Sequence, residues 1–113
     1  MIFCFDIDGV ICRTKGTMYT RSKPLKKNIK VINMLYEKGH TIILHTGRYF
    51  LQSKIKKKKI IELDKNNTRK QLKRWGLKYN RLFFNKPNYD IFIDDKNFGF
   101  KKNWSKKLIK EYL

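Results

Sequence analysis

Phe3-Cys4-Phe5-Asp6-Ile7-Asp8-Gly9-Val10 is the stretch that decides the fold of this 113-residue chain. The apolar run before Asp6 predicts a buried strand, and two aspartates one residue apart follow it. Residues i and i+2 of a strand share a face, so the carboxylates of Asp6 and Asp8 come close together on a turn that Gly9 permits. Two such carboxylates repel each other unless a cation lies between them or one of them binds a proton. The stretch therefore favours either a Mg²⁺ site with oxygen ligands or a strand that closes in an ordinary Asx turn.

The length and composition predict one small domain over residues 1–113, with an ordinary apolar content of 41%. No stretch is long and apolar enough to span a bilayer, and the two aspartates interrupt the apolar N-terminal run. We therefore expect no membrane partner and no signal peptide, and the cytoplasm is the predicted location. Two cysteines are too few for a disulfide framework and lack the partners for a zinc site.

The net charge of +19 indicates an anionic partner such as nucleic acid. A compositional bias competes with that interpretation, because the chain has no alanine and is crowded with Lys, Asn, Ile, Phe and Tyr, as A/T-rich coding produces. We favour the compositional explanation, since the basic residues are dispersed. The dense lysine run within residues 54–59 is a lid over the site, a patch that steers anionic substrates, or only a solvated face, and we favour the solvated face.

Helical and strand patterns alternate along the rest of the chain, which predicts a parallel sheet built from βαβ units. Helices are expected over residues 24–38, from residue 67 or 68 to 76, and from residue 101 onward, and further strands over residues 41–46, 81–85 and from residue 90 or 91 to 93. Residues 49–66 are expected to form a short helix, a mobile loop or both. Residues 11–23 are expected to form a loop or small flap over the first strand's end. The predicted fold is a three-layer, Rossmann-like α/β fold with a short parallel sheet, ordered third, second, first and fourth strand, and without a cap domain.

Four candidate site residues, Asp6, Thr46, Lys86 and Asp94, each lie at or just past the end of a predicted strand. The carboxyl ends of parallel strands meet along one edge of a sheet, where ligands bind. Each residue alone is explained by a turn, a helix cap or a solvated loop, but their joint position indicates a cation site suited to phosphoryl transfer. One carboxylate can act as the nucleophile and a second can give and take a proton. Thr46 with the following backbone amides would supply neutral donors, and Lys86 would supply positive charge.

At these positions the chain resembles the haloacid dehalogenase-like (HAD) phosphatases. Four motifs of that family occur in order, in residues 5–10, residues 43–48, Lys86-Pro87 and Ile93-Asp94-Asp95. A closer likeness is to the small capless members found with bacterial capsule and surface-polysaccharide genes. It is carried by the pattern T-x-x-Q-L-x-x-W-G in residues 68–76 and by residues 86–96.

The resemblance implies a Mg²⁺-dependent phosphatase that hydrolyses a small phosphorylated metabolite, such as a sugar phosphate, through an aspartyl-phosphate. By this resemblance Asp6 is the nucleophile and a metal ligand, and Asp8 is the acid/base and a metal ligand. Thr46, Gly47 and Arg48 are implied to hold the substrate. Lys86 is implied to steady Asp6 and the phosphate, and Asp94 with Asp95 to complete the metal site. Two alternatives stay open: a nucleic-acid end (3′-) phosphatase and a non-catalytic basic module that binds nucleic acid. A homo-oligomer also stays open, because a site without a cap domain could be closed by a neighbouring subunit.

Overall fold

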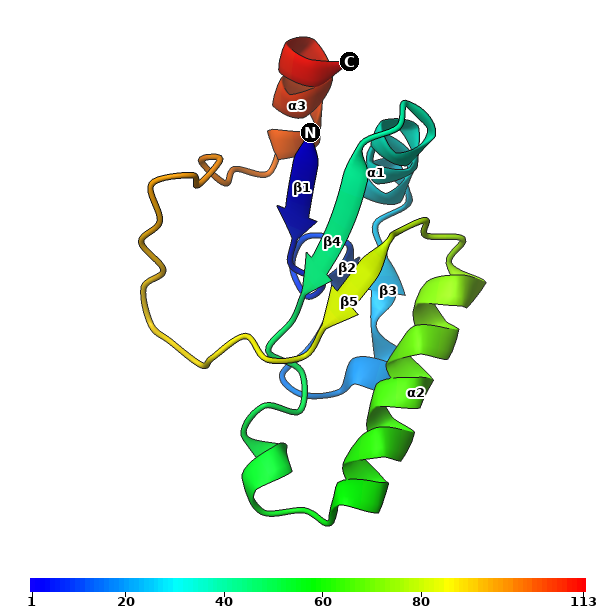
Figure 1. Cartoon of the computed structure of the whole chain (residues 1–113), viewed down its shortest axis with the longest axis vertical. Coiled ribbons are helices and arrows are strands. Elements are labelled where there is room, and N and C mark those ends of the chain that lie inside the picture. The colour runs from blue at the N-terminus through cyan, green and yellow to red at the C-terminus, as the bar shows by residue number, and fades with distance from the viewer.

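The computed structural model describes all 113 residues as a three-stranded parallel sheet, a two-stranded ribbon and three α-helices (Figure 1). In chain order the elements are β1 (Ile2–Phe5), β2 (Cys12–Arg13), the 3-10 turn η1 (Tyr19–Arg21), β3 (Lys23–Pro24), α1 (Lys26–Glu37), β4 (Thr41–His45), the 3-10 turn η2 (Gln52–Lys54), α2 (Lys58–Arg74), β5 (Arg81–Phe83) and α3 (Trp104–Tyr112). The main sheet has the order β1-β4-β5, which confirms the predicted α/β fold and the placement of its first three strands.

The register of the sheet brings the ends of its strands to one edge. Phe5 at the end of β1 lies opposite Leu44 of β4, and Leu44 lies opposite Leu82 of β5. Asp6 and Thr46 follow directly after β1 and β4, so both leave the sheet at its carboxyl edge. The ribbon β2–β3 and η1 occupy the segment predicted to form a loop or flap after β1, and β3 extends one residue beyond it to Pro24, where the sequence predicts the start of a helix.

One face of the sheet carries the core. Ile29, Ile32 and Leu35 of α1 recur at helical spacing and are buried with Ile42 and Leu44 of β4. The C-terminal helix α3 covers β1 on the same face, where aromatic rings of the strand contact aromatic rings of the helix. These pairs are Phe3 with Tyr112 at a ring-centroid separation of 5.3 Å and Phe5 with Trp104 at 5.8 Å.

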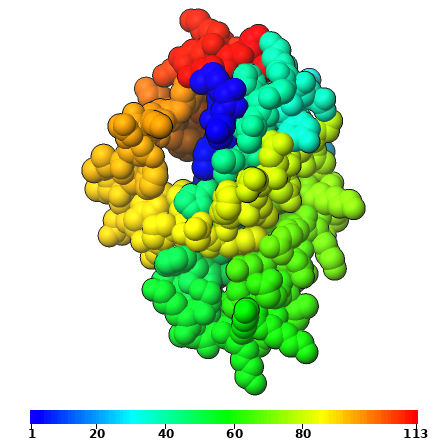
Figure 2. All heavy atoms as spheres, in the orientation of Figure 1, coloured from blue at the N-terminus to red at the C-terminus, as the bar shows by residue number.

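The opposite face of the sheet is largely open, since Ile2 is 69% exposed and Phe83 is 41% exposed. Figure 2 shows atoms of β1 at the surface there, in blue. The two faces are therefore covered unequally, whereas a complete three-layer arrangement has helices on both faces.

The predicted fourth strand is wrong for this structure, because residues 90–93 form no strand and β1 remains an edge strand. The segment after β5 swings away from β1 before it returns to α3, drawn in yellow to orange in Figure 1. Ile91 is 78% exposed and Ile93 is 90% exposed. Pairing these residues with β1 would bring Asp94 and Asp95 toward Asp6, where the three carboxylates would repel one another.

Helix α2 begins at Lys58, within residues 49–66, for which the sequence predicts a short helix, a loop or both, and it continues through the position where a separate helix was predicted to begin, residue 67 or 68. The lysine run therefore belongs partly to η2 and partly to the first turn of α2, and its side chains are exposed. The first turn holds no acidic residue and the N-cap residue Lys57 makes no side-chain capping hydrogen bond. No helix in the chain has the length and apolar character needed to cross a bilayer.

Candidate functional site

Asp6 leaves the end of β1 and pairs with a lysine 80 residues away. Its Oδ1 accepts a hydrogen bond from the Ile7 amide at 2.7 Å, and its Oδ2 accepts one from Nζ of Lys86 at 3.0 Å. The Lys86 side chain is 13% exposed and the Asp6 side chain 32% exposed. The carboxylate therefore stays reachable from solvent while its cationic partner is mostly covered.

The Lys86 ammonium is enclosed by aromatic side chains as well as by Asp6. Its Nζ lies 5.3 Å from the ring centroid of Tyr89 and 5.5 Å from that of Phe92. Burial alone would lower the pKa of Lys86, but its contacts with Tyr89 and Asp6 outweigh burial and raise the pKa above the ordinary lysine value. Lys86 therefore remains a cation throughout the neutral pH range.

The loop after β4 lies against the loop that carries Lys86. The Lys86 amide donates to the Thr46 carbonyl oxygen at 3.2 Å, and a Cβ added at Gly47 would come within 3.4 Å of the Lys86 carbonyl oxygen. Thr46 is fully buried, and its Oγ1 accepts a hydrogen bond from the Arg48 amide at 3.1 Å. The amide of the exposed Gly47 donates to no group of the protein, so a neutral donor is free at this edge.

Asp8 is held by Arg48, not by a second carboxylate or by Lys86. Nε of Arg48 donates to Oδ2 of Asp8 at 2.9 Å and Nη2 donates to Oδ1 at 2.8 Å, which is the fork geometry of a strong pair. The Thr14 hydroxyl also donates to Oδ1. Burial alone would raise the pKa of Asp8, but the hydrogen bonds and charge of Arg48 outweigh it and hold this pKa below its ordinary value.

Arg48 points into the protein, although the resemblance to HAD phosphatases implies contact with substrate. The side chain is 1% exposed, and its Nη1 donates to Oε1 of Gln71 at 2.7 Å and to Oγ1 of Thr68 at 3.3 Å. Thr68 and Gln71 are the polar members of the pattern T-x-x-Q-L-x-x-W-G, and the sequence analysis gave them no role. One feature of the sequence could have identified them as functional: two polar residues lie three apart on the inner face of a helix, next to the buried Leu72.

Asp94 and Asp95 do not join the other predicted site residues. Both are exposed in the segment between β5 and α3, and Oδ1 of Asp94 accepts a hydrogen bond from the Lys96 amide at 3.0 Å. That bond lowers the pKa of Asp94. No group of three or more His, Cys, Asp or Glu side chains in the chain is placed to hold a metal ion. As arranged, Asp6 and Asp8 are each neutralised by a protein cation, so the predicted ligands do not form a Mg²⁺ site.

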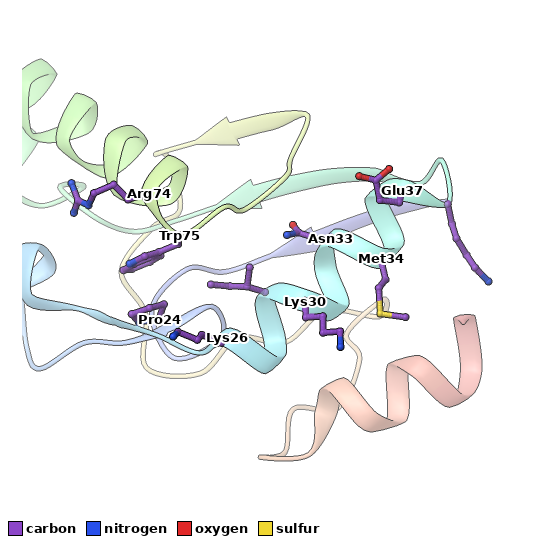
Figure 3. Close-up of a pocket in the computed structure, with 10 residues that line it drawn as sticks. Pro24, Lys26, Lys30, Asn33, Met34, Glu37, Arg74 and Trp75 are labelled. Carbon is purple, nitrogen blue, oxygen red and sulfur yellow. The ribbon is translucent and has the colours of Figure 1, made fainter.

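A separate cavity of about 660 Å³ opens between α1 and the end of α2 (Figure 3). Its lining includes Trp75 and Pro24 together with Lys26, Lys30 and Arg74. None of the predicted site residues lines it. It combines an aromatic side chain with several cations and one carboxylate, that of Glu37.

One solved structure is similar to this chain over almost its whole length. The crystal structure of a structural-genomics target from Vibrio cholerae has a TM-score of 0.74 to this chain and covers 96% of each chain, at 17% sequence identity. At that identity the likeness shows a shared fold alone. No protein-family model matches the chain, and the search of the curated proteins found no significant match.

Proposed function

We propose that this chain is a phosphatase of the HAD type that hydrolyses a small phosphate monoester, such as a sugar phosphate or a related metabolite. The observation that carries the proposal is the 3.0 Å pair between Asp6 and Lys86 at the carboxyl edge of the sheet, beside the free amide of Gly47. A carboxylate nucleophile, a fixed cation and a neutral donor are what phosphoryl transfer requires of a protein. The likeness to capless members encoded with polysaccharide genes supports a sugar phosphate as the substrate class.

In the proposed reaction an oxygen of Asp6 forms a bond to phosphorus while the bond from phosphorus to the substrate alkoxide breaks. The alkoxide takes a proton, and water then attacks the aspartyl-phosphate, which releases inorganic phosphate and restores the Asp6 carboxylate. Lys86 and the Gly47 amide offset the negative charge on the phosphoryl oxygens. Asp8 is the proposed group for both proton transfers. Because Arg48 holds its pKa low, the protonated form that gives the first proton is a minor species at neutral pH, and the carboxylate that takes the second is the main one.

Magnesium is the proposed cofactor, but the donors present do not fit it as they stand, and we derive no step from it. The residues that would hold it are Asp6, Asp8, Asp94 and Asp95, and we propose that Asp94 and Asp95 would reach the edge that holds Asp6 if residues 91–93 added to the free edge of β1. The exposed side chains of Ile91 and Ile93 and the unpaired edge of β1 support this proposal. The cation would remove the repulsion among the carboxylates.

The test is turnover of an aryl phosphate with and without Mg²⁺, followed by a panel of phosphorylated metabolites. Asp6→Asn should abolish turnover, because an amide cannot form the aspartyl-phosphate. Asp90→Asn is the matched control, since it removes the same charge from an exposed position outside the site. Turnover by Asp6→Asn at the wild-type rate would contradict the assignment of the nucleophile. Full activity after exhaustive chelation would contradict the proposed cofactor.

A nucleic-acid end phosphatase is the second candidate, and the cavity in Figure 3 favours it. Trp75 could stack on a base, and Lys26, Lys30 and Arg74 could neutralise phosphates. A 3′-phosphorylated oligonucleotide assayed beside the metabolite panel separates the two candidates. Trp75→Leu should raise the KM for the oligonucleotide alone. Tight binding of the oligonucleotide without release of phosphate would instead indicate a non-catalytic module.

A further inference from the structure

Arg48 has no donor left for a substrate. Its Nε and Nη2 face Asp8, and Nη2 is also within 3.3 Å of Oγ of Ser22. Its Nη1 is taken by Gln71 and Thr68. A guanidinium that is 1% exposed and engaged on all three nitrogens cannot also clamp an incoming phosphate.

The same guanidinium joins three parts of the chain that lie far apart in the sequence. Asp8 belongs to the turn after β1, Gln71 belongs to α2, and the ring of Tyr19 in η1 lies 4.8 Å below the Arg48 guanidinium carbon. Gln71 completes the connection, because its Nε2 donates to the Tyr19 carbonyl oxygen at 2.7 Å while its Oε1 accepts from Arg48. Gln71 therefore fixes Arg48 without touching Asp8.

The direction of the Asp8 carboxylate depends on this connection. Asp8 precedes Gly9, whose φ of +85° places a sharp turn next to it, and the turn alone leaves the rotation of the carboxylate undetermined. A planar fork bound to both oxygens sets that rotation. Because the Arg48 guanidinium is also hydrogen-bonded to the long helix α2, it holds the rotation of the Asp8 carboxylate rigidly. This is how a supporting side chain orients a reacting group.

We propose that Arg48 and Gln71 are positioning residues for the reaction: Arg48 fixes the orientation of the Asp8 carboxylate, Gln71 anchors Arg48 to α2, and neither residue touches the substrate. This inference rests on the proposed phosphatase function. It reassigns Arg48 from substrate binding to orientation of the acid/base group, and it gives a role to Gln71 in the T-x-x-Q pattern.

The experiment compares Arg48→Lys, Gln71→Leu and the double variant with the wild type, using an aryl phosphate and measuring kcat and KM separately. Gln52→Leu in η2 is the matched control, because it makes the same exchange outside the Arg48 network. Lysine keeps the charge but loses the fork, so kcat should fall about tenfold to a hundredfold, as a misplacement near 1 Å produces. KM should stay within about twofold of the wild-type value, since no substrate contact is removed. The double variant should match Arg48→Lys alone, because Gln71 acts only through Arg48.

Several outcomes would overturn the inference. A raised KM with unchanged kcat would assign Arg48 to substrate binding. Losses of kcat in Arg48→Lys and Gln71→Leu that multiply in the double variant would make the two residues independent. Losses that disappear after correction for the folded fraction, measured by thermal melting, would make the network structural only.

Gln71→Leu keeps the inference testable if Arg48→Lys does not fold, because it leaves the Arg48–Asp8 pair in place. A folded Gln71→Leu variant with wild-type kcat would overturn the anchoring role. A folded wild type without activity on any phosphate tested would overturn the proposed function, and the positioning roles with it. Wild-type activity with unaffected variants would overturn the positioning roles alone.

Discussion

Replacing Asp8 by asparagine exchanges one carboxylate oxygen for an amide and leaves the buried Arg48 charge without its counter-charge. In the folded protein the two side chains share two hydrogen bonds, at 2.8 and 2.9 Å. The Arg48 side chain is 1% exposed and the Asp8 side chain is 28% exposed. The variant therefore tests whether this pair matters for folding before any question of activity is asked.

The expected loss of stability is large for a chain of this size. Removing one partner of a buried ion pair costs about 3–5 kcal/mol, because the other charge stays buried and unpaired. Water can reach the Asp8 side of the pair, so we expect a loss near the lower limit, about 3 kcal/mol. Small domains have a total stability of about 5–15 kcal/mol. The melting temperature should therefore fall by about 10–15 °C, at roughly 4 °C for each kcal/mol in a domain of this size.

The loss should also depend on pH in a defined direction. The pKa of Asp8 in the folded protein lies below its ordinary value, because Arg48 favours the carboxylate. The contribution of Asp8 is therefore complete above the unfolded pKa of about 3.9 and is lost as the pH falls through the folded pKa. The difference in stability between wild type and Asp8→Asn should be constant between about pH 5 and 8 and should shrink below about pH 4.

Urea unfolding followed by tryptophan fluorescence at several pH values measures this difference directly. Acid expansion of the highly basic chain affects both proteins alike, so subtraction isolates the contribution of Asp8. Asp90→Asn serves as the control, since Asp90 is exposed and should change stability by no more than about 0.5 kcal/mol. Equal unfolding midpoints for Asp8→Asn and the wild type at pH 7 would refute the reasoning. A difference that stays undiminished well below pH 3 would refute its pH dependence.

Three further predictions concern other parts of the chain. Lys86→Met should lower kcat by about 10²–10³-fold, as loss of one preorganised donor does. The same variant should bind Mg²⁺ more tightly by calorimetry, and weaker Mg²⁺ binding would contradict this expectation. Lys57→Asp should stabilise the protein by about 0.5–2 kcal/mol, because it adds the N-cap that α2 lacks, and an unchanged thermal melt would argue against this account of the helix start. Ile91→Lys with Ile93→Lys should leave the metal-free melting temperature unchanged but abolish Mg²⁺-induced protection of amides 91–93 from hydrogen exchange, and protection that persists would exclude the proposed strand addition.

The sequence predicted those parts of the molecule that depend on local patterns and on one topological rule. An apolar run that ends in polar residues identified the first three strands, and helical spacing identified α1. The rule that parallel strands end at one edge placed Asp6, Thr46 and Lys86 in neighbouring loops before any contact between them was known. The 3.0 Å contact between Asp6 and Lys86, across 80 residues, is the kind of contact that this rule can anticipate.

The sequence could not predict the directions in which side chains point, or whether the shortest predicted strand, residues 91–93, pairs with the sheet. Arg48 follows the strand end in the same way as Thr46, and no periodicity states whether a loop side chain points to solvent or turns inward to meet Asp8. Residues 91–93 have the composition of a strand but form none, and the carboxylates at their carboxyl end would oppose pairing beside Asp6. The start of α2 stays open between a helix and a loop in the sequence, because lysines in a first helical turn oppose the helix dipole and count against a helix start.

The charge arrangement at the sheet edge bears on how a phosphate and a metal ion could both use it. Asp6 is matched by Lys86 and Asp8 by Arg48, so the edge presents two neutral pairs and does not repel an approaching phosphate. The same pairing works against a cation, because Mg²⁺ would compete with the Lys86 ammonium for Oδ2 of Asp6. Further acidic ligands would be needed to outweigh that competition, and the proposed ones are Asp94 and Asp95, which are exposed in the segment between β5 and α3. The proposed strand addition and the tighter Mg²⁺ binding expected of Lys86→Met therefore both address one electrostatic conflict at Asp6.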